Sequence, residues 1–270
     1  MDFVIATKNS AATIEKCISS IVSSIPKKIV VDNVSSDDTI NIVKRLKRKL
    51  KDKLEIAQVE GLLGKVRLKQ AELASTEWIV YVDSDVYIYK NWWKTTSPYM
   101  TQDSGWVLGA LRTKYSEPYK SFFEWSIMRF GGVALSNTAV RRRFVLEIAD
   151  CLEKLHGNED APIYEHVLSE GYKAHFVKEL IGEHEGDKDG LLPSKAIRAG
   201  QSIRIRRALP IALAVGIKLM FTNQAKALLY FIEIKRDVPS LLRLAGIQLW
   251  LSLLFLKGIF EIRNIITNLG

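Results

Sequence analysis

The fold is decided by one stretch of the sequence, Trp78-Ile79-Val80-Tyr81-Val82-Asp83-Ser84-Asp85. Its five apolar residues predict a buried strand, and two carboxylates follow where that strand ends. Two acids one residue apart cannot both face a packed core without partners, so we place them beyond the strand. There they can serve as hard oxygen ligands for Mg²⁺ or Mn²⁺, with a diphosphate completing the shell. A D-x-D alone is also common in solvated turns; its place after a buried strand favours function.

Two apolar runs with polar ends lie upstream of this stretch. Phe3-Val4-Ile5-Ala6 leads into Thr7 and Asn9, and Ile29-Val30-Val31 leads into Asp32 and Asn33. Helical stripes over 14–25 and 40–50 separate the runs, with Ser35 and Asp38 spaced like a capping box before the second. A third strand over 54–57 and a helix over 66–74 complete the alternation. Such alternation indicates βαβ units and a Rossmann-like, mostly parallel sheet covered by helices on both faces. Ligands gather at the carboxyl ends of such strands, so these polar residues and the acidic triplet are expected together.

Beyond Asp85 the pattern is looser. It predicts strands over 106–110, 131–135 and 172–177, and helices over 143–155 and 161–169. The Gly- and Asp-containing segment 182–193 is the best candidate boundary. We therefore expect a catalytic domain over 1–190 and an amphipathic, apolar helical region over 191–270.

The composition of the C-terminal region and the basic net charge indicate an anionic partner. The formal net charge is +9, and apolar stretches over 210–221, 227–234 and 244–256 are separated by basic residues. None of these reaches the roughly 20 uncharged residues of a confident membrane-spanning helix. Helices lying in a membrane interface are preferred; helices buried against the catalytic domain or a second subunit are the alternative. Cys17 and Cys151 show no metal or disulfide spacing, and no secretory signal is expected, which favours the cytoplasm.

The order of these motifs resembles that of a family 2 glycosyltransferase with the GT-A fold. The resemblance covers roughly residues 3 to 180 and is carried by these stretches: Val4 to Asn9, Ile29 to Thr39, Gly64-Lys65, Ile79 to Asp85, Gly131 to Leu135, Glu159-Asp160 and Gly171-Tyr172. It does not extend to the C-terminal third.

The resemblance implies roles at the donor side of a site. Asp32 and Asn33 would contact the nucleoside, Asp83 the ribose and Asp85 the metal. Many relatives have a second acid where this sequence has Asn33, so uridine and guanosine both stay open. One cation among Lys65, Arg67 and Lys69 would contact the nucleotide; the alternative for each is a solvated helix face.

The resemblance also implies a base and an acceptor side. Glu159-Asp160 matches an acidic pair that begins a helix, with Asp160 as the catalytic base and Glu159 on the acceptor side. Inverting transfer needs such a group because the attacking hydroxyl must lose its proton, and a helix N-terminus keeps a carboxylate charged. An N-cap acid without a catalytic part is the alternative. His184 would be a second metal ligand or an exposed loop residue, and Trp125 is an acceptor-side candidate.

The expected function is thus inverting, Mn²⁺- or Mg²⁺-dependent transfer of a sugar from a UDP- or GDP-linked donor. The acceptor group would be a hydroxyl or phosphate. We expect it on a lipid-linked or glycan acceptor at the cytoplasmic face of a membrane. A catalytically silent, membrane-attached nucleotide-sugar-binding scaffold is the main rival, and a nucleotidyltransferase is a weaker one. A dehydrogenase is disfavoured because no G-x-G-x-x-G follows the first strand. Nucleic-acid binding is disfavoured because the basic residues form no reader motif.

Overall fold

The computed structural model describes residues 1–21, 27–114, 119–130, 132–185, 191–235 and 238–260. The chain divides into two compact units. Unit 1 comprises Met1–Thr113, Gly132–Lys154 and Glu159–Gly186, and unit 2 comprises Lys114–Gly131, Leu155–Asn158 and Asp187–Gly270. Each unit is described by itself below.

The described strands of unit 1 form one mixed sheet in the order β3-β2-β1-β4-β7-β6-β8-β5. The strands are β1 (Asp2–Thr7), β2 (Lys27–Asp32), β3 (Leu54–Gln58), β4 (Trp78–Asp83), β5 (Val86–Ile88), β6 (Ser104–Thr113), β7 (Asn137–Arg141) and β8 (Lys173–His184). The first four strands along the edge run parallel, as do β6 and β8, whereas β7 runs antiparallel to both β4 and β6.

The register of the parallel strands brings their polar ends together. Thr7 pairs with Asp32 across β1 and β2, and Ala6 pairs with Asp83 across β1 and β4. The sequence expectation that these residues share one edge of the sheet is therefore confirmed.

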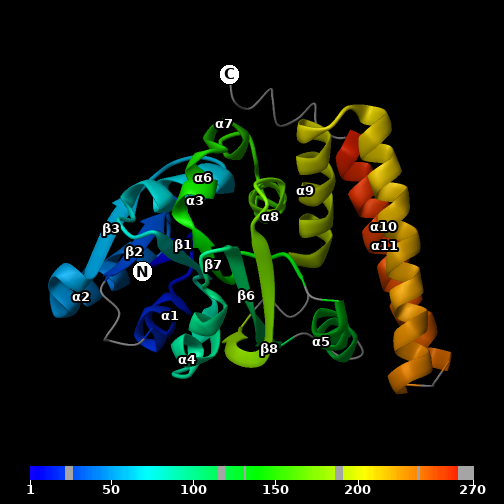
Figure 1. Cartoon of the computed structure of the whole chain (residues 1–270), viewed down its shortest axis with the longest axis horizontal. Helices are drawn as coiled ribbons and strands as arrows, with labels where there is room; N and C mark the ends of the chain where they lie inside the picture. Colours follow the sequence, from blue (N-terminus) through cyan, green and yellow to red (C-terminus); the bar gives the residue numbers. More distant parts are fainter. Residues whose placement is uncertain (22–26, 115–118, 131, 186–190, 236–237, 261–270) are drawn as a thin grey trace. The chain divides into compact units, whose positions relative to one another are not determined.

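Helices cover both faces of this sheet (Figure 1). One face carries α1 (Ile14–Ser20), α2 (Thr39–Leu50) and α4 (Trp92–Thr96), and the other carries α3 (Leu63–Leu73), α6 (Arg142–Leu146), α7 (Ala149–Leu152) and α8 (Asp160–Ser169). Short 3₁₀ turns follow α2 and α4, at Lys51–Lys53 and Ser97–Tyr99. Alternating apolar side chains such as Phe3, Val30 and Val80 are buried between the sheet and the helices. Each such side chain contributes about 1.5–3 kcal/mol through its removal from water.

Three local predictions were wrong. Residues 132–135 do not form a strand; the strand is Asn137–Arg141, whose residues pair with β4. The helix expected over 143–155 is two short helices, because the backbone at Ile148 leaves the helical region. Ser35 is not a helix cap: α2 starts at Thr39, and Asp37, not Ser35, accepts the Thr39 backbone N–H.

Other predicted elements agree with the structure to within a few residues. The helix expected over 14–25 is seen as Ile14–Ser20, with its last part outside the described residues. The strand expected over 172–177 continues to His184. That extension matters because it carries His184 into the sheet beside β5.

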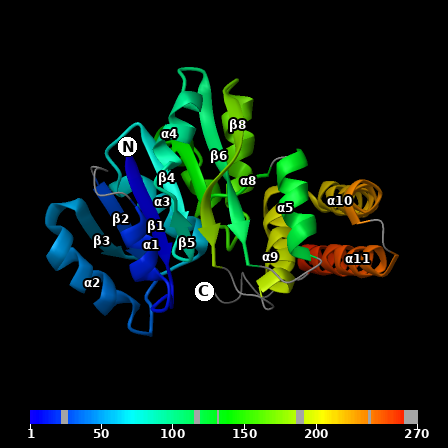
Figure 2. The ribbon, with the colours of Figure 1, turned by 90° about the horizontal axis from the view of Figure 1, so that it is seen from below.

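Unit 2 is helical. It contains α5 (Tyr119–Phe130), α9 (Leu191–Arg206), α10 (Leu209–Tyr230), a π-helical turn η3 (Phe231–Lys235) and α11 (Val238–Phe260). Figure 2 shows α9, α10 and α11 side by side, and α5 packs against α10. Within the described residues α11 has the length and hydropathy of a helix that could cross a membrane, although composition alone is weak grounds for a span.

Candidate active site

Asp32 is one of three polar residues that end adjacent parallel strands, and hydrogen bonds hold its carboxylate in place. Its Oδ2 accepts hydrogen bonds from the Ser35 backbone N–H at 3.0 Å and from Gln58 Nε2 at 2.9 Å. Its Oδ1 accepts the Ser35 hydroxyl at 2.5 Å. Asp32 is fully buried, so these donors satisfy a charge that water cannot reach. Thr7 beside it is buried too, and its hydroxyl has no hydrogen-bond partner among the described residues.

Side-chain hydrogen bonds join the loops that follow β1 and β2. Asn9 adopts a left-handed backbone with φ 50°, and its Oδ1 accepts the Ser36 backbone N–H at 2.8 Å. Asp37 accepts the Ala11 N–H at 3.0 Å, and its bond from the Thr39 hydroxyl lowers the pKa of Asp37 below its usual range. Asn and Asp suit these positions because their short side chains bond readily to nearby backbone groups. The two loops therefore form one fixed rim beside the strand ends.

Asn33 fixes a third loop to that rim. Its Nδ2 donates to the Gly61 carbonyl at 3.0 Å, and its Oδ1 accepts the Gly61 N–H at 3.3 Å. An acid could accept one of these bonds but could not donate the other. The departure from an acidic pair at 32–33 thus has a structural consequence in this chain: the amide pairs with a loop backbone in both directions.

The centre of the site is the buried Arg67 on α3. Its Nη2 donates to Asp83 Oδ1 at 2.5 Å, and its Nε donates to Glu159 Oε1 at 3.1 Å. The Arg67 and Glu159 side chains are 4% and 6% exposed, whereas that of Asp83 is 33% exposed. Burial acts to lower the pKa of Arg67, but the two carboxylates outweigh it and raise that pKa above its ordinary value. Arg67 Nη1 is buried and has no partner among the described residues.

The structure distinguishes the three cations that the sequence left equal. Lys65 is exposed, with its aliphatic stem against Gly61, and Lys69 Nζ lies 3.0 Å from Glu72 on the helix surface. Of the three, Arg67 is the one that pairs with the strand-end acid Asp83 and with Glu159 at the start of α8.

Asp85 and His184 lie together although 99 positions separate them. Antiparallel pairing of β5 with β8 places Val86 opposite His184, and His184 Nε2 lies 3.2 Å from Asp85 Oδ2. Both side chains are half-buried, and the Glu185 N–H donates to the Asp85 carbonyl at 2.8 Å. The Asp85 carboxylate suits Mn²⁺ or Mg²⁺ when donor phosphates supply further oxygen ligands, and the His184 imidazole is better suited to the transition metal Mn²⁺ than to Mg²⁺. The described residues contain no group of three or more His, Cys, Asp or Glu placed to hold a metal, so these two fit a shared site and not an all-protein cage.

Asp160 is the first residue of α8, next to the Arg67 partner Glu159. Its Oδ1 accepts the Ala161 backbone N–H at 2.9 Å. Burial first, and then the neighbouring Glu159 carboxylate, raise the pKa of Asp160 to about 7. A carboxyl with that pKa is suited to take up a proton near neutral pH.

Trp125 belongs to unit 2. Its indole Nε1 donates to Glu233 at 3.2 Å, and its ring packs 5.3 Å from that of Tyr230 between centroids. Its acceptor-side role stays a prediction.

Sequence reasoning missed the residues that hold the acidic triplet in place. The Ser84 and Ser10 hydroxyls lie 2.8 Å apart, and the Cys17 thiol donates to the Asp83 carbonyl at 3.4 Å. Burial, followed by the charges of Asp85 and Asp83, raises the pKa of Cys17, so this thiol stays protonated. A serine in the first loop and a cysteine on an apolar helix face carry no local signal of such contacts.

Comparison with known proteins supports the family resemblance that the sequence motifs indicated. The sequence profile of the family described as "Glycosyl transferase family 2" matches residues 2–149. TarS of Staphylococcus aureus (strain Mu50), a poly(ribitol-phosphate) beta-N-acetylglucosaminyltransferase, is 32% identical over 117 residues, which are 39% of this chain and 19% of that protein. The chain thus spans about a fifth of the curated relatives it matches.

Two solved structures have the same fold at low sequence identity. The mannosyltransferase PcManGT from Pyrobaculum calidifontis, in complex with GDP-Man and Mn²⁺, matches with a TM-score of 0.68 at 17% identity, covering 97% of this chain and 87% of that one. S. aureus TarS 1-349 in complex with UDP-GlcNAc matches with a TM-score of 0.58 at 18% identity, covering 99% and 90%. The expected GT-A-like α/β fold is confirmed by these neighbours. The profile of glycosyltransferase family 2 matches more than half of the chain, so the protein belongs to this family.

Proposed function

We propose that the protein transfers a sugar from a nucleotide-diphospho-sugar to an acceptor with inversion of the anomeric configuration. One observation carries this proposal: Arg67 links the strand-end acid Asp83 to Glu159, the residue before Asp160. A donor-side acid and a group suited to accept a proton are therefore parts of one connected site.

The chemistry that we propose is a single displacement. The acceptor oxygen forms a bond to the anomeric carbon as the bond from that carbon to the diphosphate breaks, and the electron pair leaves with the diphosphate. The acceptor proton passes to a carboxylate oxygen of Asp160. The pKa of about 7 supports this role, because the residue is then substantially ionised at neutral pH and still basic enough to take a proton.

On the donor side we assign the nucleotide to the rim built from Thr7, Asn9, Asp32 and Asn33, with Asp83 toward the ribose. A divalent cation held by Asp85 and His184 would neutralise charge that develops on the leaving diphosphate. Neighbouring structures support both nucleotides, since TarS was solved in complex with UDP-GlcNAc and PcManGT in complex with GDP-Man and Mn²⁺. Of the two exposed helix cations we assign Lys65 to the donor phosphates, because Lys69 is paired with Glu72 on the helix surface.

Arg67 and Glu159 are positioning residues in this proposal. The Glu159 carboxylate is buried and bonded to Arg67, so it can act on an acceptor only through Asp160. Its negative charge raises the proton affinity of Asp160, and the positive charge of Arg67 limits that rise. Glu159 thus shapes the acceptor side without contact with the reacting atoms.

We further propose that the enzyme works at the cytoplasmic face of a membrane on a membrane-presented acceptor, lipid-linked or glycan. Support comes from the basic, apolar sequence beyond residue 190.

Time-resolved NMR of donor hydrolysis tests the proposed reaction. The protein is incubated with a panel of UDP- and GDP-sugars and Mn²⁺, and the first sugar anomer released to water is recorded before mutarotation. We expect one donor class to be hydrolysed and to release the anomer opposite to that in the donor. Release of the same anomer would contradict the displacement. Metal-dependent nucleotide binding without turnover on any donor, unchanged in Asp160→Asn, would favour the silent binding protein.

A further inference from the structure

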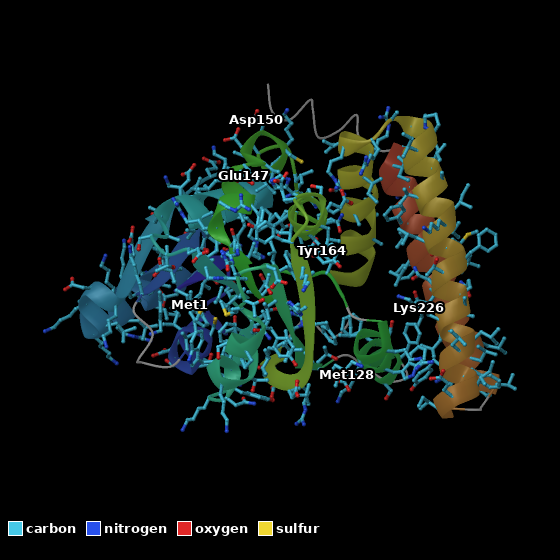
Figure 3. The ribbon with its side chains drawn as sticks, viewed as in Figure 1. Met1, Met128, Glu147, Asp150, Tyr164 and Lys226 are labelled. Atoms are coloured by element: carbon cyan, nitrogen blue, oxygen red, sulfur yellow. The ribbon has the colours of Figure 1, made fainter. Side chains whose placement is uncertain are left out.

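Helices α10 and α11 of unit 2 carry an unusual amount of exposed apolar surface. Two thirds of the large apolar side chains that are exposed in the described residues lie between Ile211 and Phe260. On α11 they recur at helical spacing: Leu242, Leu249, Trp250, Leu253 and Phe260. Figure 3 shows side chains projecting from α10 on the side turned away from α9. We call this exposed set, on α10 and α11 together, the apolar face.

Two polar side chains of α11 are buried while large apolar side chains of the same helix are exposed. On α11 Gln248 and Ser252 are buried at 5% and 4% exposure, while Trp250 and Leu253 between and beside them are 50% and 53% exposed. The Ser252 hydroxyl donates to the Gln248 carbonyl at 2.8 Å within the buried seam. A helix in water shows the reverse arrangement, with its apolar stripe inward. Polar and small residues inside with apolar residues outside is the pattern of helices packed in lipid.

Glycines bring the helix backbones of unit 2 into direct contact. A Cβ on Gly200 of α9 would lie 2.0 Å from the Phe255 carbonyl oxygen, and one on Gly258 of α11 would lie 2.0 Å from that of Ile197. Because the two contacts are reciprocal, α9 and α11 are locked as one body. The apolar face is therefore a fixed feature of that body and cannot turn inward by rotation of α11.

Charge identifies what covers the apolar face. Residues 191–270 contain 12 basic residues (Lys and Arg) and 3 acidic residues (Asp and Glu), whereas residues 1–190 contain 27 basic and 27 acidic residues. The whole formal net charge of +9 therefore lies in the region that bears the apolar face. Basic residues beside apolar ones attract anionic headgroups while the apolar side chains enter the acyl region. A second copy would bring a like charge of the same size against it, which opposes association.

We propose that the apolar face of α10 and α11 lies in one leaflet of an anionic lipid bilayer, with α11 in the interface and not across the membrane. This inference specifies the partner of the proposed peripheral localisation and does not depend on glycosyl transfer.

The packing of α9 decides between these two modes. If α11 crossed the bilayer, its reciprocal glycine contacts would carry α9, with Arg198 and Arg204, into the hydrocarbon. Each buried arginine costs about 2.5–3.5 kcal/mol at the membrane centre. Lys218 on the exposed side of α10 adds a third such charge. In the interface these side chains can reach the headgroups instead.

Vesicle flotation of the full chain tests the proposal with matched variants. The test variant is Trp250→Glu with Leu253→Glu on α11; the control is Trp93→Glu with Leu168→Glu in unit 1, where the two side chains are 56% and 44% exposed. We expect the wild type and the control to float with vesicles containing 30% anionic phosphatidylglycerol and the test variant to lose at least tenfold in bound fraction. Wild-type binding should also weaken in pure phosphatidylcholine vesicles and at high salt.

Two further outcomes are discriminating. Brominated lipids quench tryptophan fluorescence, and the part of this quenching that is lost in Trp250→Phe reports on Trp250. That part should be stronger when the bromines lie near the headgroup end of the acyl chain than when they lie near its terminal methyl group. The reverse order would indicate a crossing helix. Light scattering that showed a wild-type dimer, a monomeric test variant and no vesicle binding would assign the face to a second copy. Nucleotide binding is measured on the same samples, so failure of membrane binding and failure of the proposed enzymatic function are separate results.

Discussion

The two units of the chain place polar and apolar groups in opposite ways. In unit 1 apolar side chains fill the space between sheet and helices, and the buried charges Arg67 and Glu159 are paired. In unit 2 Gln248 and Ser252 lie inside while Trp250 and Leu253 face outward. Unit 1 is built as a water-soluble protein is, with a few costly buried charges retained at one edge. Unit 2 has the distribution expected where the surroundings are apolar.

The largest effect that we expect concerns catalysis in unit 1. Asp160→Asn keeps the size of the side chain and its bond from Ala161 but removes the base. Donor turnover should fall by about 10²–10⁴-fold, as is usual when a general base is lost. The measurement is kcat for donor hydrolysis, with nucleotide affinity determined in parallel. Asp150→Asn, on the exposed surface of α7, is the matched control and should retain full turnover.

A loss of stability follows if the buried charges of unit 1 are unpaired. Arg67→Met leaves Asp83 and Glu159 without their cation, which should lower the free energy of unfolding by about 3–5 kcal/mol. Urea unfolding measures this. Lys69→Met removes a surface pair with Glu72 and should cost under about 1 kcal/mol. Equal losses of unfolding free energy in the two variants would show that Arg67 does not stabilise the buried carboxylates.

Unit 2 should be sensitive at its glycines instead of at its charges. Gly200→Ala forces a Cβ against the Phe255 carbonyl, and the overpacking should cost about 1–3 kcal/mol. Gly246→Ala lies on the same bundle with nothing within 4 Å of its new Cβ, and it should be neutral or stabilising by up to about 1 kcal/mol through helix propensity. Thermal unfolding followed by helical circular dichroism compares them. A stable Gly200→Ala protein would mean that α9 and α11 are not in backbone contact.

The smallest effect is a pH dependence. Because the folded-state pKa of Asp160 is about 7, above the ordinary 3.8, the folded protein holds a proton there that the unfolded chain releases. This contribution to stability is present below pH 4 and is lost as the pH rises to about 7. Asp160→Asn should therefore match the stability of the wild type at pH 4 and be more stable than the wild type at pH 8. Turnover by the wild type should rise through pH 7 as the base ionises. A difference in stability that is the same at both pH values would argue against the raised pKa.

The sequence predicted the parallel half of unit 1 because its signals are local. Apolar runs with polar ends mark β1, β2 and β4, and the rule for parallel sheets then places Thr7, Asp32 and Asp83 at one edge. The contact between Arg67 and Glu159 has no local signal, since 92 positions separate the two residues. The same holds for Asp85 and His184, which meet only because β8 continues seven residues past the end of the predicted strand and pairs with β5.

The wrong strand at 131–135 has a different cause. The run over 131–135 resembles a strand in its apolar content, although its two glycines disfavour one. The strand that pairs with β4 contains the β-branched residues Thr138 and Val140, which have high strand propensity. In unit 2, apolar content predicted helices, but which side chains face outward depends on the packing of α9 against α11, and only the structure gives it.

The measurement that tests the central claim most directly is nucleotide binding by calorimetry, with and without Mn²⁺, for the wild type, Asp85→Ala and His184→Ala. We expect UDP- or GDP-sugar to bind the wild type in a Mn²⁺-dependent way, and each substitution to abolish that dependence while the fold is retained by circular dichroism. Nucleotide binding that is absent, or that is the same with and without Mn²⁺ in all three proteins, would contradict a donor site at the strand ends of unit 1.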